Sequence, residues 1–315
     1  MKKLLFVTDV HARSVSPASR LDADFMSAIE DKLGHVAAIA SDKRVDMVIL
    51  GGDMFDRPDV PNSVIIRIMR AMHKIPGQVL SIVGQHDIYG YQKKSVATSA
   101  IGVLNESGSL RVFDSISDKG IFIKAIHAYD KTDLNIDESA KINIIVAHKL
   151  ITNKSIPGAI SIAALEETNK ANIILSGDMH EPHDIMVNGR LYLNPGSLTR
   201  LSISDINRKP QVAIITINDD YSFSHELVIV PHKPSDGIFD AAGYTEEKLQ
   251  ERRTEDFVKT YASAVMSVKA EAYKIGTGLR DFMKANSIPE PVKKKVTEYY
   301  EGSEKNVLEN NKDAQ

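Results

Sequence analysis

Short apolar runs alternate with longer stretches of helical periodicity in the first half of the chain. Residues 4–7, 47–50 and 79–83 are short and almost wholly apolar, which is typical of strands buried on both faces. Residues 24–40 and 63–72 instead repeat apolar side chains at helical spacing. This alternation predicts a layered α/β fold with helices outside a mostly parallel sheet.

The predicted strands lie closer together in the second half. Apolar runs recur at residues 111–113, 121–126, 142–146 and 173–175. Turn residues then join two hairpins: Asn188-Gly189 between 184–187 and 191–193, and residues 218–220 between 211–217 and 222–230. The pattern as a whole predicts two facing β-sheets flanked by helices, in the α/β class.

The sequence changes in character after Pro231, where Pro234, Gly237 and Gly243 mark a connector. Beyond it, residues 245–274, 279–284 and 291–300 are predicted to be helices. Residues 302–315 are polar, and we expect them to be disordered. The chain is therefore predicted to contain a core over residues 1–232, a small C-terminal helical region over 233–301 and a tail over 302–315.

Composition narrows the class of protein. The chain has 315 residues, of which 43% are hydrophobic, enough for a large α/β domain with an appendage. A net charge of -3 gives no support for a nucleic-acid partner, although a local basic face could serve one. The absence of cysteine excludes disulfides and thiolate metal sites. With no predicted signal peptide or membrane span, we expect a cytoplasmic protein.

Acidic, imidazole and amide side chains follow five of the predicted strands. They lie in Asp9-Val10-His11, Gly52-Asp53, Gly84-Gln85-His86-Asp87, His148 and Gly177-Asp178-Met179-His180. Each motif alone is more often a cap, a turn or a surface pair, but five in order after apolar runs predict convergence at one sheet edge. Oxygen and nitrogen ligands crowded there are what a pair of divalent metal ions requires.

The order of these motifs resembles that of the calcineurin-like metallophosphoesterases. Within them the chain is most similar to SbcD-type recombination and repair nuclease subunits of bacteria and phages, through residues 52–58 and 194–200. The resemblance covers about residues 1–230. It implies a four-layer sandwich of two sheets and flanking helices, a nuclease core over 1–232 and a partner-binding role for 233–301.

The resemblance also implies roles for the motif residues. Two divalent ions share Asp53: the first is held also by Asp9, His11 and His180, the second also by Gln85, His148 and Asp178. His86 is the implied catalytic histidine, acting as a proton donor or stabilising the transition state, and Asp87 is expected to orient it.

Two residues depart from the family pattern. Gln85 stands where the family has Asn, and Asp178 stands where it has His. Replacing an imidazole by a carboxylate makes the ligand set harder and favours manganese, or magnesium, over zinc. The departures are consistent with a weakened or metal-selective enzyme, or with lost catalysis; we favour activity because His86 and Asp87 remain.

The function implied is a manganese-dependent DNA exo/endonuclease that hydrolyses phosphodiesters by a two-metal mechanism. Its expected partners are DNA, an SMC-like coiled-coil ATPase of the SbcC type bound by the C-terminal helices, and a second copy of the chain through residues 63–72 and 95–104. A small-molecule phosphodiesterase or phosphatase of the same fold is one alternative, and a catalytically weakened structural DNA-binding subunit is another.

Several other residues have two possible roles, one functional and one structural. Tyr89 and Tyr91 could stack on bases or simply pack their loop. Lys149 and Arg200 could contact a phosphate backbone or be solvated. His183, three residues after His180, could approach the site or lie at the surface.

Overall fold

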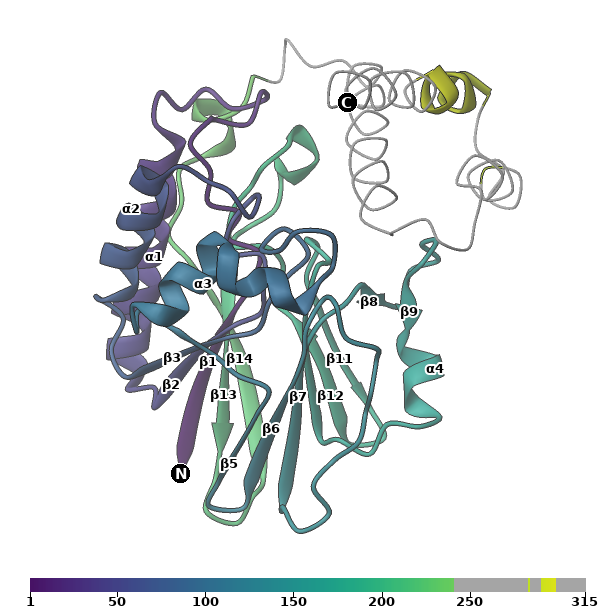
Figure 1. The fold of residues 1–315 in the computed structure, drawn as a ribbon. Helices are drawn as coiled ribbons and strands as arrows, with labels where there is room; N and C mark the ends of the chain where they lie inside the picture. Colours follow the sequence, from purple (N-terminus) through teal and green to yellow (C-terminus); the bar gives the residue numbers. More distant parts are fainter. Residues whose placement is uncertain (241–282, 284–289, 299–315) are drawn as a thin grey trace, which may run out of the picture. The chain divides into compact units, whose positions relative to one another are not determined.

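The computed structural model describes residues 1–240, 283 and 290–298, and its first unit is built around two facing sheets (Figure 1). One sheet has the strand order β14-β13-β1-β2-β3-β4. These strands are β1 (Lys2–Val7), β2 (Met47–Leu50), β3 (Gln78–Ser81), β4 (Arg111–Val112), β13 (Gln211–Ile217) and β14 (Phe223–Ile229). The run from β1 to β4 is parallel, and the hairpin of β13 and β14 adds antiparallel strands at one edge.

The other sheet has the order β11-β12-β10-β7-β6-β5. Its strands are β5 (Ser115–Asp118), β6 (Ile121–Ile126), β7 (Ile142–His148), β10 (Ile173–Gly177), β11 (His183–Val187) and β12 (Arg190–Asn194). The central strands β6, β7, β10 and β12 are parallel, and both edge strands are antiparallel. A separate short pair joins β8 (Ile151–Thr152) to β9 (Ile160–Ser161).

Helices cover the outer face of each sheet, which gives four layers (Figure 1). They are α1 (Phe25–Lys43), α2 (Asn62–Met72) and α3 (Ala100–Glu106) on the first sheet and α4 (Ile162–Glu166) on the second, with 3-10 turns η1 (Lys93–Thr98), η2 (Ile203–Asp205) and η3 (Ser235–Gly237). Strand β1 shows why its sequence is apolar throughout. Leu5 and Val7 pack under the helices, whereas Leu4 and Phe6 point into the core between the sheets.

The predicted fold class is confirmed, including the two facing sheets and their flanking helices. Asp24 proves to be the N-cap of α1, with its side chain accepting a hydrogen bond from Ser27 N. The Asn188-Gly189 turn has positive φ at both residues, as the hairpin prediction requires. The pattern missed β5, β8, β9 and α4, which are too short for a periodic pattern to stand out.

The second unit, residues 244–315, is described by itself. Residues 290–298 are helical and overlap the predicted helix at 291–300. The predicted helix at 245–274, most of that at 279–284 and the tail at 302–315 lie outside the described residues, and the domain limits at 232 and 301 stay predictions. Among the helices that are described, none is long and apolar enough to cross a bilayer.

Candidate metal centre

The five predicted motifs lie at the carboxyl ends of strands from both sheets. Asp9 and His11 follow β1, Asp53 follows β2, and Gln85, His86 and Asp87 follow β3. His148 ends β7, while Asp178 and His180 follow β10. Because parallel strands present their carboxyl ends at the same edge of a sheet, these segments converge there despite their separation along the chain.

Carboxylate and imidazole atoms from five strand ends are close enough to share metal ions. Within the described part of the chain, three groups have their ligand atoms within 4.8 Å of one another: Asp9 with His11 and His180, His11 with Asp53 and His86, and Asp9 with Asp53 and His148. Nε2 of His11 lies 3.1 Å from Nε2 of His180. Asp9, His11 and Asp53 each belong to two of the groups, but Oδ2 of Asp53 also lies between imidazoles from the two sheets, 3.3 Å from Nε2 of His148 and 4.0 Å from Nε2 of His11.

The hydrogen bonds of the site leave lone pairs facing inward. Nδ1 of His148 donates to the carbonyl oxygen of Gly51 at 2.6 Å, which directs the Nε2 lone pair toward Asp53. That Nε2 lies 3.3 Å from Oδ2 of Asp53, and neither buried atom has a hydrogen-bond partner among residues 1–240. Two ligands of one ion, each about 2.0–2.2 Å from it, can lie this far apart. The donor set therefore fits a divalent cation.

The backbone around the ligands is strained. Asp9, His11, Asp53 and Asp178 all have positive φ, between 50° and 72°. Non-glycine residues adopt this region rarely and at a cost, and such residues cluster at functional sites. Gly84 is required for a different reason: a Cβ there would overlap Oδ1 of Asp53.

Comparisons with known proteins agree with this geometry. A family model described as calcineurin-like phosphoesterase matches residues 2–182. The chain belongs to this family. It is also 24% identical over 261 residues to the DNA double-strand break repair protein Mre11 of Aeropyrum pernix, a match that covers 74% of this chain and 62% of that protein. The aligned region thus spans less than two thirds of the relative.

A solved structure shows the same fold. The dimetal phosphatase from Danio rerio superimposes with a TM-score of 0.52 at 10% identity, covering 73% of this chain and 99% of that one. Membership of the phosphoesterase family and the ligand clusters together support a metal-dependent phosphoesterase activity.

Charges in the phosphoesterase site are strongly coupled. Burial lowers the pKa of His11 well below its usual value, so this imidazole is neutral and can donate a lone pair. Burial alone would raise the pKa of Asp53, but the neighbouring His148, His86 and His11 outweigh it and hold the carboxylate ionised. Burial would lower the pKa of His148, but Asp53 outweighs it and raises that pKa, and a metal ion bound at Nε2 would take the place of the proton.

The predicted partnership of His86 with Asp87 needs correction. Nδ1 of His86 donates to the carbonyl oxygen of Asp56 at 2.9 Å, so the backbone orients the ring. The Asp87 carboxylate instead accepts hydrogen bonds from the backbone N–H groups of Phe55 and Gly84. Through these two hydrogen bonds Asp87 links two loops of the site. It acts on His86 through its charge, which raises the pKa of that histidine.

Gln85 and Asp178, the two departures from the family pattern, are hydrogen-bonded to each other. Nε2 of Gln85 donates to Oδ1 of Asp178 at 2.6 Å, across loops that follow strands of different sheets. Asp178 is in none of the three ligand groups of the described residues. The pair leaves the amide oxygen of Gln85 and Oδ2 of Asp178 as the oxygens that could reach a metal ion.

Some neighbours of the site carried little signal in the sequence. Thr8 donates to Oδ2 of Asp9 at 2.7 Å, and an isolated threonine has no motif. Burial and the charges of Asp178 and Asp53 raise the pKa of Tyr91, which places this half-exposed ring beside the site. His183 contributes to none of the ligand groups in residues 1–240.

Two of the basic residues predicted on loops are bound or buried within the protein. Lys149 Nζ donates to the carbonyl oxygens of Ala128 and Asp130. Arg200 is only 2% exposed, so the solvated reading is wrong for it.

Proposed function

We propose that this phosphoesterase is the nuclease subunit of a DNA recombination and repair complex, hydrolysing phosphodiester bonds with two divalent ions. The observation that carries the proposal is the position of Asp53, whose unpaired Oδ2 lies between ligand groups from both sheets. Such ions, when bound, neutralise the charge of the phosphoryl group and make water nucleophilic at neutral pH.

The proposed ligand sets are those that the family resemblance implies, and the ligand groups around Asp53 support them in part. One ion is held by Asp9, His11, Asp53 and His180, and the other by Asp53, Gln85, His148 and Asp178. The Gln85–Asp178 pair adds hard oxygen donors to the second set, which supports manganese, or magnesium, as the cofactor.

His86 is proposed to donate a proton to the leaving oxygen. Its Nδ1 is bound to the Asp56 carbonyl, so Nε2 is the atom available to the substrate. Burial lowers the pKa of His86, but the charge of Asp53 and the Asp56 carbonyl outweigh it and raise the pKa overall. The imidazolium therefore persists closer to neutral pH than an ordinary histidine would.

DNA as the substrate rests on two observations. The name of the archaeal relative states a role in DNA double-strand break repair. In this chain, Tyr89 and Tyr91 are 45% and 46% exposed beside the His86 loop, and exposed aromatic rings can stack on unpaired bases.

The partners are proposed by the resemblance to SbcD-type nucleases. An SMC-like coiled-coil ATPase would be bound by the C-terminal helices, which lie mostly outside the described residues. A second copy of the chain would pack against α2 and the η1–α3 region, where Ile66 and Val103 are exposed. A cytoplasmic location follows from this proposal.

The test is cleavage of single- and double-stranded DNA with manganese by the wild type and His86→Ala. We expect the substitution to reduce the rate by about 10²–10⁴-fold, the usual contribution of a positioned acid. His225→Ala is the control, since His225 pairs with Asp184 in β11. Equal background cleavage by wild type and His86→Ala would contradict the proposal.

A second substrate separates the alternatives. Hydrolysis of a nitrophenyl phosphate ester or a nucleotide without cleavage of DNA would identify a small-molecule phosphodiesterase. Fewer than about one bound ion per chain after incubation with manganese would instead indicate a decayed site, because the two-ion arrangement requires both.

A further inference from the structure

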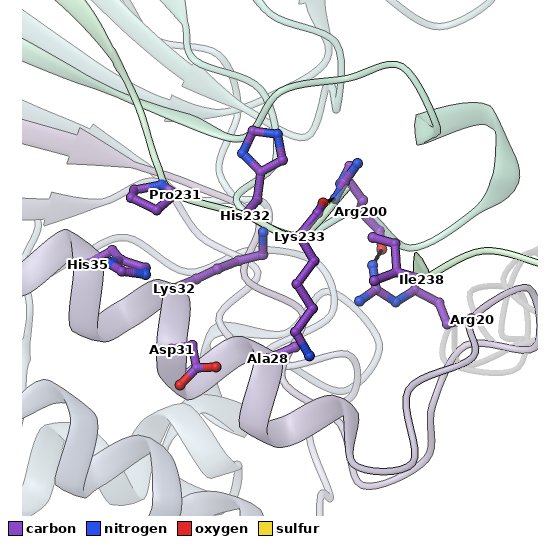
Figure 2. Close-up of a pocket in the computed structure, with 10 residues that line it drawn as sticks. All are labelled: Arg20, Ala28, Asp31, Lys32, His35, Arg200, Pro231, His232, Lys233 and Ile238. Atoms are coloured by element: carbon purple, nitrogen blue, oxygen red, sulfur yellow. Dashed lines mark hydrogen bonds between the residues drawn. The ribbon is translucent and has the colours of Figure 1, made fainter. Parts of the chain in front are cut away.

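A cluster of basic side chains surrounds a pocket between α1 and the segment that follows β14 (Figure 2). The pocket has a volume of about 290 Å³. Its basic lining consists of Arg20, Lys32, His35, Arg200, His232 and Lys233, and we call it the basic pocket. None of these residues is a proposed metal ligand, so the pocket is a separate site.

Two guanidinium groups in the basic pocket are fixed by hydrogen bonds. Arg20 donates from Nε to Asp22 at 2.6 Å and from Nη1 to the carbonyl oxygen of Arg200 at 2.9 Å. Arg200 donates from its Nη atoms to Ser235 Oγ and to the carbonyl oxygen of Lys233. Nε of Arg200 is buried and has no partner among the residues described. These hydrogen bonds fix the positions of both positive charges and leave one N–H of Arg200 without an acceptor.

Lys32 is the least compensated of these cations. It extends from α1 toward His232 (Figure 2). Its side chain is only 7% exposed. Its Nζ makes no hydrogen bond or ion pair within residues 1–240, while Asp31 points away from it (Figure 2). Burial and the charges of Arg200, Arg20 and Arg208 lower the pKa of Lys32 to about 7, and the charge of Asp22, which is bound to Arg20, offsets only part of this.

We propose that the basic pocket binds a phosphate group, with Lys32 Nζ as the donor and the guanidinium groups of Arg20 and Arg200 as the neighbouring positive charges. A buried ammonium beside two guanidinium groups is costly without a counter-charge, and an anion would remove that cost. The convergence of three cations favours a phosphate group over a carboxylate, because a phosphate offers more anionic acceptor oxygens and, when it is free or terminal, a second charge. The phosphate could belong to a free phosphate compound or to a DNA strand, and both offer the same oxygen acceptors.

The experiment measures binding to the full-length, metal-loaded protein by calorimetry. The probes are inorganic phosphate, a nucleoside monophosphate and a short single-stranded DNA without terminal phosphate. The variant is Lys32→Met, which keeps the length of the side chain and removes its charge. Lys43→Met in the same helix is the matched control, because Lys43 pairs with Glu226 outside the pocket.

We expect Lys32→Met to weaken binding of at least one probe by about tenfold or more, the loss typical of a hydrogen bond from a charged donor. Lys43→Met should bind as the wild type does. Loss confined to phosphate and the nucleotide identifies a free phosphate compound, and loss confined to DNA identifies a strand phosphate. Unchanged binding of every probe, or an equal loss in Lys43→Met, would overturn the proposal.

The metal centre also attracts phosphate and must be separated from the basic pocket. Asp53→Asn removes the bridging carboxylate and leaves every residue of the pocket unaltered. We expect this variant to retain one Lys32-dependent site for the probe that identified it. If Asp53→Asn abolishes all binding of that probe, the pocket is not a site, whatever the outcome for nuclease activity.

Discussion

The metal centre and the basic pocket are both buried and charged, but the metal centre lacks a positive partner and the basic pocket lacks a negative one. At the metal centre, Oδ2 of Asp53 and the metal-facing Nε2 of His148 are buried without a hydrogen-bond partner among the described residues. In the basic pocket, Arg200 Nε is buried without an acceptor among the described residues, and the Lys32 side chain lines the pocket with only 7% of its surface exposed. The first arrangement calls for a cation and the second for an anion, so the chemistry of each ligand follows from what is left unpaired.

Residues 194–200 connect the two regions. Ser197 N donates to the carbonyl oxygen of His180 at the metal centre, and Thr199 Oγ1 donates to that of Val10. The segment then ends at Arg200, inside the basic pocket. A motif noted in the sequence for its family resemblance is therefore a physical link between a metal ligand and a pocket cation.

The largest effect is expected from Asp53→Asn. Losing the shared carboxylate should remove both ions and reduce phosphodiesterase activity by at least about a thousandfold, roughly 4 kcal/mol of transition-state stabilisation. Metal content by mass spectrometry and the rate with manganese provide the measurements.

The matched control for that substitution is Asp56→Asn. The Asp56 side chain pairs with Arg13, and its backbone carbonyl, which orients His86, is unaffected by the change. This variant should keep its metal and remain within about tenfold of wild-type activity, as expected for a partly exposed ion pair. If both variants lose activity equally, Asp53 has no special role.

The sequence predicted the metal centre better than the basic pocket for a physical reason. Each ligand motif follows a buried strand, and the ends of parallel strands must meet, so Asp9, Asp53 and His148 could be placed together without coordinates. Lys32 lies within an amphipathic helix, and Arg200 lies in an irregular loop. Nothing in the local pattern of either residue indicated that its charge would be buried.

Detail within the metal centre was also beyond the sequence. Backbone groups such as the Asp56 carbonyl leave no mark in a motif, so the partner of His86 was predicted as Asp87 instead. The layers of the fold were more predictable, because burial on two faces dictates the apolar strands directly. Short elements such as α4 depend on tertiary packing rather than on their own periodicity.

The second prediction concerns the pH dependence of stability. The pKa of Lys32 is about 7 in the folded protein against 10.5 ordinarily. Below about pH 7 the residue is protonated in both states, and the folded protein bears the full penalty. Between about pH 7 and 10.5 the unfolded chain binds more protons, so stability rises with pH.

Lys32→Met should abolish this dependence. In chloride buffer we expect the variant to exceed the wild type by about 2–4 kcal/mol near pH 6 and to converge with it near pH 10.5. Urea unfolding at several pH values is the measurement, and parallel curves would disprove the effect. Other charged or titratable groups also face Lys32 and contribute to the electrostatics around it: Arg20, Asp22, Asp31, His35, Arg200, Arg208, His232 and Lys233. Saturating phosphate should flatten the wild-type curve if the basic pocket binds it.

A third prediction tests the connecting segment through Gly196. This residue has φ 77°, and a Cβ there would lie 2.7 Å from the carbonyl oxygen of His180. Gly196→Ala should cost about 1–3 kcal/mol of stability and displace His180, lowering metal affinity.

Gly189→Ala provides the control for Gly196→Ala. Gly189 has the same φ of 77°, but a Cβ there would meet nothing within 4 Å. The control thus shares the backbone strain without the contact and should cost only about 1 kcal/mol. A phosphate affinity that changes in Gly196→Ala alone would show that the two regions are coupled, whereas separate behaviour would limit residues 194–200 to a structural link.

The smallest effect is expected within the second ligand set. Asp178→His restores the imidazole of the family pattern, and Gln85→Asn restores the shorter amide. We expect Asp178→His to lower the affinity for manganese relative to zinc by about tenfold, because a softer nitrogen donor replaces a carboxylate oxygen. Competition between the two ions, followed by calorimetry, measures this ratio, and Asp184→His in β11 is the control.

The double variant then shows whether the two departures act together. Gln85 and Asp178 share a hydrogen bond of 2.6 Å, so either single substitution leaves the other side chain without its partner. We expect the effects on manganese affinity to be non-additive by about 1 kcal/mol, the usual net contribution of one hydrogen bond. Additive effects would mean that the two residues bind the ion independently. Non-additive effects would mean that neither can be understood as a single replacement in the family's ligand set, because each is the partner that positions the other.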